Sequence, residues 1–420
     1  MAKGRYRQVG MATAPENPPP KPWTHFSMVT QPNVFWKKED LVPVSGPWEE
    51  ARDEELYALK AEIETSFVSS YNWDAWKKIC NPFEYIYTPA KDSNPLPSIS
   101  LLNPLSRSYF KMWEMLELTG ITKALPQRVR SAHICEGPGG FIQAIYDSVE
   151  RERKQVGSTL AMTLRPDHAS VPGWKRAANF LRRHRTIHIE YGPKKNGDIL
   201  DPENQAAYVA EAIHGAHIFT ADGGFDFSDE YDKQELNIYN LLVNSILLAI
   251  QSLTQNGSVV LKIFDIQSRA TEDLLAICAS QFKQWTLYKP ATSRPCNSEK
   301  YFIGTGFRGK NPLIINYLKH ISAEIREGRS FTKLLPEDFE YGRQIRETIQ
   351  RIQAPILERQ KLSIQNVLKI SKEKSFEEQR INSFIYGAEN ALEWCRVFRI
   401  PTRQNAMESL ATILPPTCRS

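Results

Sequence analysis

The segment HICEGPGGFIQAIYDSV, residues 133–149, reads as a short apolar strand, a glycine-rich turn and a helix. The turn contains Gly137, Pro138, Gly139 and Gly140. Glycines at such a junction let a ligand approach the backbone closely, and the N-terminus of the following helix attracts negative charge. A dinucleotide, a nucleotide phosphate and a sulfonium cofactor all suit a turn of this kind.

The amino-acid sequence of the turn narrows the choice of ligand. The dinucleotide fingerprint G-x-G-x-x-G requires a glycine where Ile142 stands, and the phosphate-binding signature GxxxxGK[ST] is missing as well. A ligand with a carboxylate and an adenosine but no phosphate still fits, which favours S-adenosylmethionine. A strand-to-helix turn that binds no ligand is the alternative for this segment taken alone.

Alternating strand and helix patterns surround the turn. Seven apolar segments are candidate strands: SAHICE, TLAMTL, TIHIEY, AHIFTAD, SVVLKIF, WTLYKP and KYFIGTGF. Amphipathic helices such as DKQELNIYNLLVNSILLAIQSL lie between most of them. The alternation predicts an α/β fold with a doubly wound, mostly parallel, seven-stranded sheet. The last two strands are expected to form an antiparallel hairpin at its edge.

Composition limits the class of protein. The 420 residues carry a net charge of +5, which allows a polyanionic partner but does not demand one. No apolar run approaches the ~20 residues that cross a bilayer, and the basic, proline-rich N-terminus lacks the apolar core of a secretory signal. The six cysteines show no CxxC spacing, which fits a reducing compartment. We expect an intracellular protein that requires no metal.

Four charged residues stand out against this pattern. Asp222 directly follows an apolar strand, at the edge where open α/β sheets bind ligands. Lys262 interrupts an apolar strand, where an unpaired lysine is costly. Lys111 lies on the helix SRSYFKMWEML, and Glu299 begins the last strand. Taken singly, three of them have ordinary explanations as a turn former, a solvated lysine and a surface carboxylate, whereas Lys262 is hard to dismiss.

In their order along the chain, Lys111, the glycine turn, Asp222, Lys262 and Glu299 resemble the FtsJ-like (RrmJ-type) ribose 2′-O-methyltransferases, which share a Lys-Asp-Lys-Glu tetrad. Within that family, ADGGF and SRPCNSEKY look most like the mRNA cap enzymes of eukaryotes and large DNA viruses. The resemblance implies a Rossmann-like, S-adenosylmethionine-dependent methyltransferase. Its substrate would be the 2′-hydroxyl of a 5′-proximal nucleotide of capped RNA.

The resemblance also implies a set of cofactor contacts: Gly137, Pro138, Gly139, Gly140, Phe141, Asp198 and Asp222. Of these, Asp198 is expected near the adenine. The second strand ends in MTLRPD without an acid at its tip, so no side chain is assigned to the cofactor ribose. Glu136, which precedes the glycines, has no assigned role.

For the chemistry, we expect Lys262 to remove the proton from the hydroxyl and Lys111 to be the neighbouring cation. Asp222 and Glu299 would orient the two lysines. The carboxylates raise the pKa of Lys262, whereas burial and Lys111 lower it. The sequence leaves open which effect prevails.

RNA recognition would combine phosphate contacts with stacking on aromatic rings. The basic segments LRRHR at 181–185 and FRGK at 307–310 are candidate phosphate contacts or solvated faces. The candidate stacking residues are Trp73, Trp76, Phe83, Tyr85, Tyr87, Phe225, Phe227 and Tyr231. Most of these rings are expected in the core.

The expected organisation has four regions: a disordered tail at 1–23, an extension at 24–103, the methyltransferase domain at 104–308 and a helical extension at 309–420. Rival interpretations are an rRNA or tRNA ribose methyltransferase, a catalytically silent RNA-binding subunit and, less favoured, a dinucleotide oxidoreductase. Other capping or transcription proteins are possible partners. The location would be nuclear for a cellular protein and cytoplasmic for a viral one.

Overall fold

The computed structural model describes residues 21–51, 53–67, 70–88, 98–165, 173–224 and 234–403. Most of the tail expected at 1–23 falls outside these ranges, as do Phe225, Phe227 and Tyr231. Within the ranges, no helix combines the length and the apolarity needed to span a membrane.

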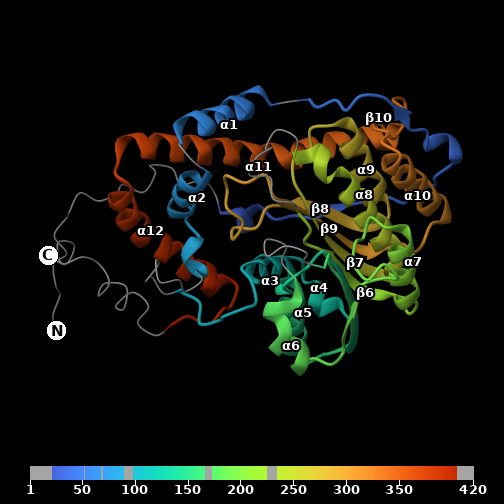
Figure 1. Cartoon of the computed structure of the whole chain (residues 1–420), viewed down its shortest axis with the longest axis horizontal. Helices are drawn as coiled ribbons and strands as arrows, with labels where there is room; N and C mark the ends of the chain where they lie inside the picture. Colours follow the sequence, from blue (N-terminus) through green and yellow to red (C-terminus); the bar gives the residue numbers. More distant parts are fainter. Residues whose placement is uncertain are drawn as a thin grey trace.

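A mixed eight-stranded sheet lies at the centre of the fold, in the order β1-β8-β9-β7-β6-β3-β4-β5 (Figure 1). The five strands from β7 to β5 in this order run parallel, and β9 runs antiparallel to β7 and β8. The strands are β1 Val29–Thr30, β3 Arg128–Ile134, β4 Gln155–Met162, β5 Ile187–Glu190, β6 Ala216–Ala221, β7 Leu253–Ile263, β8 Phe282–Tyr288 and β9 Lys300–Phe307. The mostly parallel α/β sheet predicted from the sequence is confirmed. The sheet has one strand more than predicted. This strand, β1, pairs with β8, so the hairpin of β8 and β9 does not end the sheet.

Helices cover both faces of the sheet. One core cluster joins β7 residues Val259, Leu261 and Ile263 to the helices α7 Pro202–Glu211, α8 Gln234–Ser252, α9 Arg269–Ser280 and α10 Pro312–Arg326. A second cluster joins Val260 to α3 Ser108–Thr119, α4 Ile121–Ala124, α5 Gly140–Arg151 and α12 Phe376–Val397. Because side chains alternate along a strand, Lys262 lies on the same face as Val260, toward α3 and α5.

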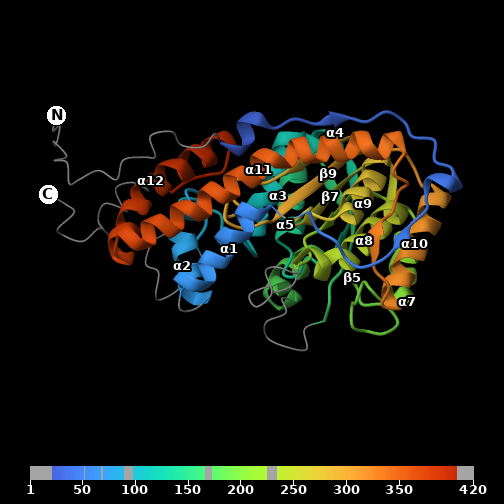
Figure 2. The same cartoon turned by 90° about the horizontal axis from the view of Figure 1, so that it is seen from above.

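The terminal regions fold against the sheet and against each other. The 34-residue α11, Glu340–Glu373, runs along the molecule and contacts α1 Glu54–Ser66 and α2 Ser70–Ile79 (Figures 1 and 2). Their shared core contains Leu56, Trp73 and Ile364. A two-stranded sheet pairs β2 Val44–Ser45 with β10 Phe331–Lys333. Segments from both ends of the chain therefore complete one packed structure.

Glu114 on α3 joins three distant segments inside the second cluster. Its fully buried carboxylate accepts hydrogen bonds from the Tyr288 hydroxyl at 2.5 Å, the Ala291 N–H at 2.9 Å and the Trp394 indole N–H at 2.9 Å. Burial raises the pKa of Glu114 to about 7 in spite of these donors. The helix α12 is thus tied to the sheet through a carboxylate on α3.

We predict that Trp394→Phe lowers the free energy of unfolding by about 1–3 kcal/mol, because it removes the indole N–H that donates to the buried Glu114 carboxylate. Urea denaturation measures this loss. The same substitution in a Glu114→Leu background should cost less, since leucine offers no acceptor for the indole N–H, and this cycle removes the contribution of ring volume. Equal losses in the two backgrounds would contradict the prediction.

Candidate active site

The glycine turn lies at the carboxyl end of β3, where strands of an open α/β sheet bind ligands. Gly139 is the N-cap residue of α5, and its φ of +103° is one that residues other than glycine rarely adopt. Its N–H donates to the Glu136 carbonyl at 2.5 Å. The first N–H groups of α5 have no partner within the helix, so they can bind a carboxylate.

The next two residues of the turn also have a packing role. A Cβ atom on Gly140 would lie 2.2 Å from the hydroxyl oxygens of Ser106 and Ser108, so Gly140 permits the close contact between α5 and the start of α3. Phe141 is 1% exposed, and its ring lies 5.7 Å from that of Tyr301. Gly140 and Phe141 can therefore bind a ligand through their backbone N–H groups and not through side chains.

Asp198 lies in the connection between β5 and α7, where its carboxylate accepts the Leu200 N–H at 2.9 Å. Burial and Glu136 raise the pKa of the Cys135 thiol to about 12, and Asp198 adds to the shift. The preceding residue, Gly197, packs against the Thr163 carbonyl directly after β4, so Asp198 lies at the carboxyl end of the strand next to β3. The acid of MTLRPD, Asp167, lies outside the described residues.

The four predicted tetrad residues lie together at this edge and form two ion pairs. Lys262 Nζ is 2.9 Å from Asp222 Oδ1 and donates to the Asp222 carbonyl at 2.9 Å. Lys111 Nζ is 2.6 Å from Glu299 Oε1. All four side chains are between 11% and 14% exposed. The structure therefore brings together residues that are far apart in sequence.

Tyr301 links the two ion pairs and was not predicted. Its hydroxyl lies 3.1 Å from Asp222 Oδ1 and 3.0 Å from Glu299 Oε1. It stands opposite Lys262 in the register of β9 and β7. The sequence could have indicated Tyr301, because it lies two residues after Glu299 on an expected strand and residues i and i+2 of a strand share a face.

The pKa of Lys262, the candidate base, depends on burial and on two nearby carboxylates. Burial lowers the pKa of Lys262, but the negative charges of Asp222 and Glu299 outweigh it and raise that pKa above its usual value. Burial raises the pKa of Glu299, but Lys111, Lys262 and Lys289 reverse this and hold that pKa far below its usual value. The resting site therefore holds a protonated Lys262 and ionised Glu299.

A third lysine, Lys289, supports the segment that carries Glu299. It follows β8, is 4% exposed, and donates to the carbonyls of Asn297 at 2.6 Å and Glu299 at 2.7 Å. Burial lowers the pKa of Lys289 to about 7, although Glu299 opposes the shift. The sequence signal was a lysine at the end of the apolar segment WTLYKP, which is a candidate strand.

Glu136 belongs to a buried polar group beneath the glycine turn. It accepts a short hydrogen bond from the Thr220 hydroxyl, and His133 Nδ1 lies 2.7 Å from that hydroxyl and 3.6 Å from Glu136 Oε1. Burial raises the pKa of Glu136, and the charge of Asp222 adds to the increase. Glu136 thus braces the ends of β3 and β6 against each other.

Among the candidate RNA contacts that the structure describes, most of the aromatic rings are buried. Trp73, Phe83, Tyr85 and Tyr87 are at most 6% exposed, and Trp76 is partly buried against Phe376 with ring centroids 5.3 Å apart. The segment 181–185 precedes β5, and 307–310 follows β9. Because β9 is antiparallel, both basic segments lie at the edge opposite the tetrad.

Known proteins resemble the central part of this chain. The FtsJ-like methyltransferase family matches residues 104–307. The Cap-specific mRNA (nucleoside-2′-O-)-methyltransferase 1 of Dictyostelium discoideum is 28% identical over 270 residues, which are 59% of this chain and 36% of that protein. The Cap-specific mRNA (nucleoside-2′-O-)-methyltransferase 2 of Mus musculus is 27% identical over 220 residues, 50% of this chain and 29% of that protein.

One relative is named as lacking activity. The Inactive cap-specific mRNA (nucleoside-2′-O-)-methyltransferase 1B of Caenorhabditis briggsae is 29% identical over 203 residues, 47% of this chain and 23% of that protein. This chain spans about a quarter to a third of the length of these curated relatives. The family match covers the glycine turn and all four tetrad positions. Residues 104–307 are a domain of the FtsJ-like methyltransferase family.

Proposed function

We propose that this chain is an S-adenosylmethionine-dependent ribose 2′-O-methyltransferase that acts on the capped 5′ end of RNA. The observation that carries the proposal is the pair of linked ion pairs, Lys262–Asp222 and Lys111–Glu299, beside the glycine turn. An FtsJ-like domain and relatives named as cap-specific methyltransferases support the substrate class.

The residues at the turn fit the proposed cofactor. The N–H groups at the start of α5 that lack a partner within the helix suit its carboxylate, and Gly139 adds no side chain of its own beside them. Asp198 would bind near the adenine. The cofactor would supply a methyl group already activated by a positive sulfur, so the protein has mainly to position the hydroxyl and accept its proton.

The tetrad would divide this work among its members. Lys262 would accept the proton of the 2′-hydroxyl at Nζ after first releasing its own. Asp222 holds Lys262 in place through both its carboxylate and its carbonyl. Lys111 and Tyr301 fix Glu299, and Tyr301 also reaches Asp222. Truncating one carboxylate would therefore disturb both lysines.

The alternatives differ in substrate and in activity. An rRNA or tRNA ribose methyltransferase would use the same four residues. A silent RNA-binding subunit is the second alternative, and one relative is named as inactive. Here all four positions are filled and paired, which favours activity.

We predict that labelled methyl groups pass from S-adenosylmethionine to a capped short RNA and not to the same RNA with a 5′ triphosphate. Mapping should place the label on the ribose of a 5′-proximal nucleotide. Equal transfer to both RNAs would favour the rRNA or tRNA alternative. Binding of capped RNA without any transfer would favour the silent subunit.

The second prediction concerns Lys262→Arg, which keeps a positive charge beside Asp222 but cannot release a proton at accessible pH. We expect turnover to fall about 10²–10⁴-fold, while the affinities for cofactor and RNA stay close to wild type. Single-turnover methyl transfer and calorimetric titration measure the two effects. The control is Lys319→Arg on an exposed position of α10, which should leave both unchanged. A Lys262→Arg enzyme with wild-type turnover would show that this position serves only as a charge.

The third prediction concerns pH. Since the pKa of Lys262 is raised, the neutral fraction of this lysine grows about tenfold per pH unit throughout the accessible range. We expect the rate of methyl transfer to rise with unit slope above about pH 8, where Lys289, with its pKa of about 7, is already neutral. A plateau above pH 8 would argue against Lys262 as the base.

A further inference from the structure

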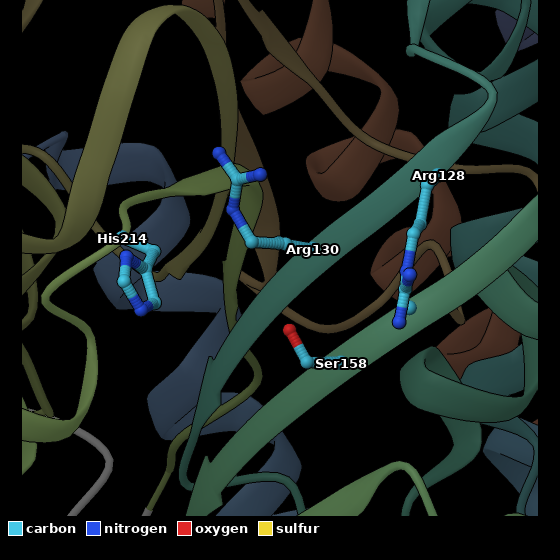
Figure 3. A pocket seen from close by; sticks show the side chains of 5 residues that line it. Arg128, Arg130, Ser158 and His214 are labelled. Carbon is cyan, nitrogen blue, oxygen red and sulfur yellow. The ribbon is translucent and has the colours of Figure 1, made fainter.

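A pocket of about 530 Å³ lies at the amino ends of the parallel strands, away from the tetrad (Figure 3). Its lining residues are Arg128, Arg130, Gly157, Ser158 and His214. In the close view, Arg128 and Arg130 extend from β3, Ser158 lies on the neighbouring strand β4, and His214 stands on the far side of Arg130. With a rise of about 3.3 Å per residue, β3 separates this pocket from the glycine turn by roughly 20 Å.

The backbone of β4 makes room for Arg128. The pairing of β3 with β4 shifts register between Val129 and Arg130, so that Gly157 is passed over. A Cβ atom on Gly157 would lie 2.6 Å from Cγ and 2.7 Å from Nε of Arg128. The long side chain of Arg128 therefore lies over Gly157, in space that a larger residue at position 157 would fill, and its guanidinium lines the pocket.

Arg130 is held from its other side. Its Nε donates to the Gly215 carbonyl at 2.7 Å, which fixes the plane of the guanidinium. Its backbone N–H donates to His217 Nδ1 at 2.9 Å. Burial and the charge of Arg130 lower the pKa of His217 to about 4, so this ring adds no charge at neutral pH. The two terminal nitrogens of Arg130 have no protein partner in the described part of the chain.

The positive charge of the pocket is not compensated by the protein. Within the described ranges, neither arginine nor His214 forms an ion pair with a carboxylate. The exposed Arg185 comes two residues before β5 and so lies at the same edge of the sheet. Planar guanidinium groups match phosphate oxygens by two-pronged hydrogen bonds. A pair of neighbouring arginines without carboxylate partners, one of them fixed by the Gly215 carbonyl, therefore suits a phosphate.

We propose that this pocket binds a backbone phosphate of the RNA strand, downstream of the nucleotide that enters the tetrad. This inference rests on the proposed function for the identity of the polyanion. The lining holds guanidinium, hydroxyl and imidazole groups and no Phe, Tyr or Trp, so it offers contacts to a phosphate and no platform for a base. Binding is independent of sequence and dependent on RNA length.

The test compares two capped RNAs, a trinucleotide and the same sequence extended by roughly 16 nucleotides. The variant Arg128→Gln/Arg130→Gln should bind the long RNA about tenfold more weakly, with a log–log salt slope lower by about 0.7 for each lost phosphate contact. Affinity for the trinucleotide should not change, because it does not reach the pocket. A control that removes two exposed charges elsewhere, Lys319→Gln/Arg343→Gln, should leave both affinities at wild type.

Gly157→Ala tests the geometry at constant charge. The added methyl group displaces Arg128, so this variant should also lose affinity for the long RNA alone. Equal affinity of wild type and Arg128→Gln/Arg130→Gln for the long RNA would overturn the proposal, as would equal losses on both RNAs. Inorganic phosphate bound at the pocket without competition from long RNA would assign the site to free phosphate and also overturn it.

The proposed function can fail separately from this inference. Fluorescence anisotropy measures RNA affinity without methyl transfer. Length-dependent binding that is lost in Arg128→Gln/Arg130→Gln would support the pocket even if no methyl transfer were detected. Loss of methyl transfer to the trinucleotide would concern the tetrad alone.

Discussion

The salt bridge between Lys262 and Asp222 is the interaction around which this fold is arranged. A lysine inside a central strand is costly to bury, and pairing is what makes the burial tolerable. The strand order supplies the partner, since β6 lies beside β7 and ends at Asp222. A second carboxylate, Glu299, arrives with the antiparallel β9. The sheet topology and the charge of the site therefore depend on each other.

The same face of the sheet also sets the distance between α3 and α5. Gly140 lets the start of α5 approach Ser106 and Ser108, and this approach fixes α3, which carries Lys111 toward Glu299. Glu114, one turn further along α3, anchors the helix to β8 and α12. A glycine turn that suits a cofactor thus also positions a residue of the tetrad. Packing and binding impose the same requirement on residue 140.

The sequence predicts the strands well, because buried parallel strands are continuous apolar runs bounded by turns. It also identifies Asp222 and Lys262, because charged residues at strand ends or inside apolar strands are rare. It does not reveal Tyr301 or the bracing role of Glu136, since these depend on register and on contacts between distant strands. The attachment of both terminal regions was hidden for the same reason, as in the pairing of β1 with β8.

Basic side chains at the two edges of the sheet differ in their partners. At the carboxyl edge, Lys111 and Lys262 are each matched by a carboxylate, and the attraction raises the pKa of Lys262. At the amino edge, Arg128 lies over Gly157 and Arg130 donates to the Gly215 carbonyl, and neither of these neighbours carries a charge. Charges of opposite sign that pair hold one another in fixed positions, whereas positive charges without such partners leave a local field that attracts anions. The net charge of +5 does not reveal this difference, because it does not show which basic side chains are paired with carboxylates and which are not.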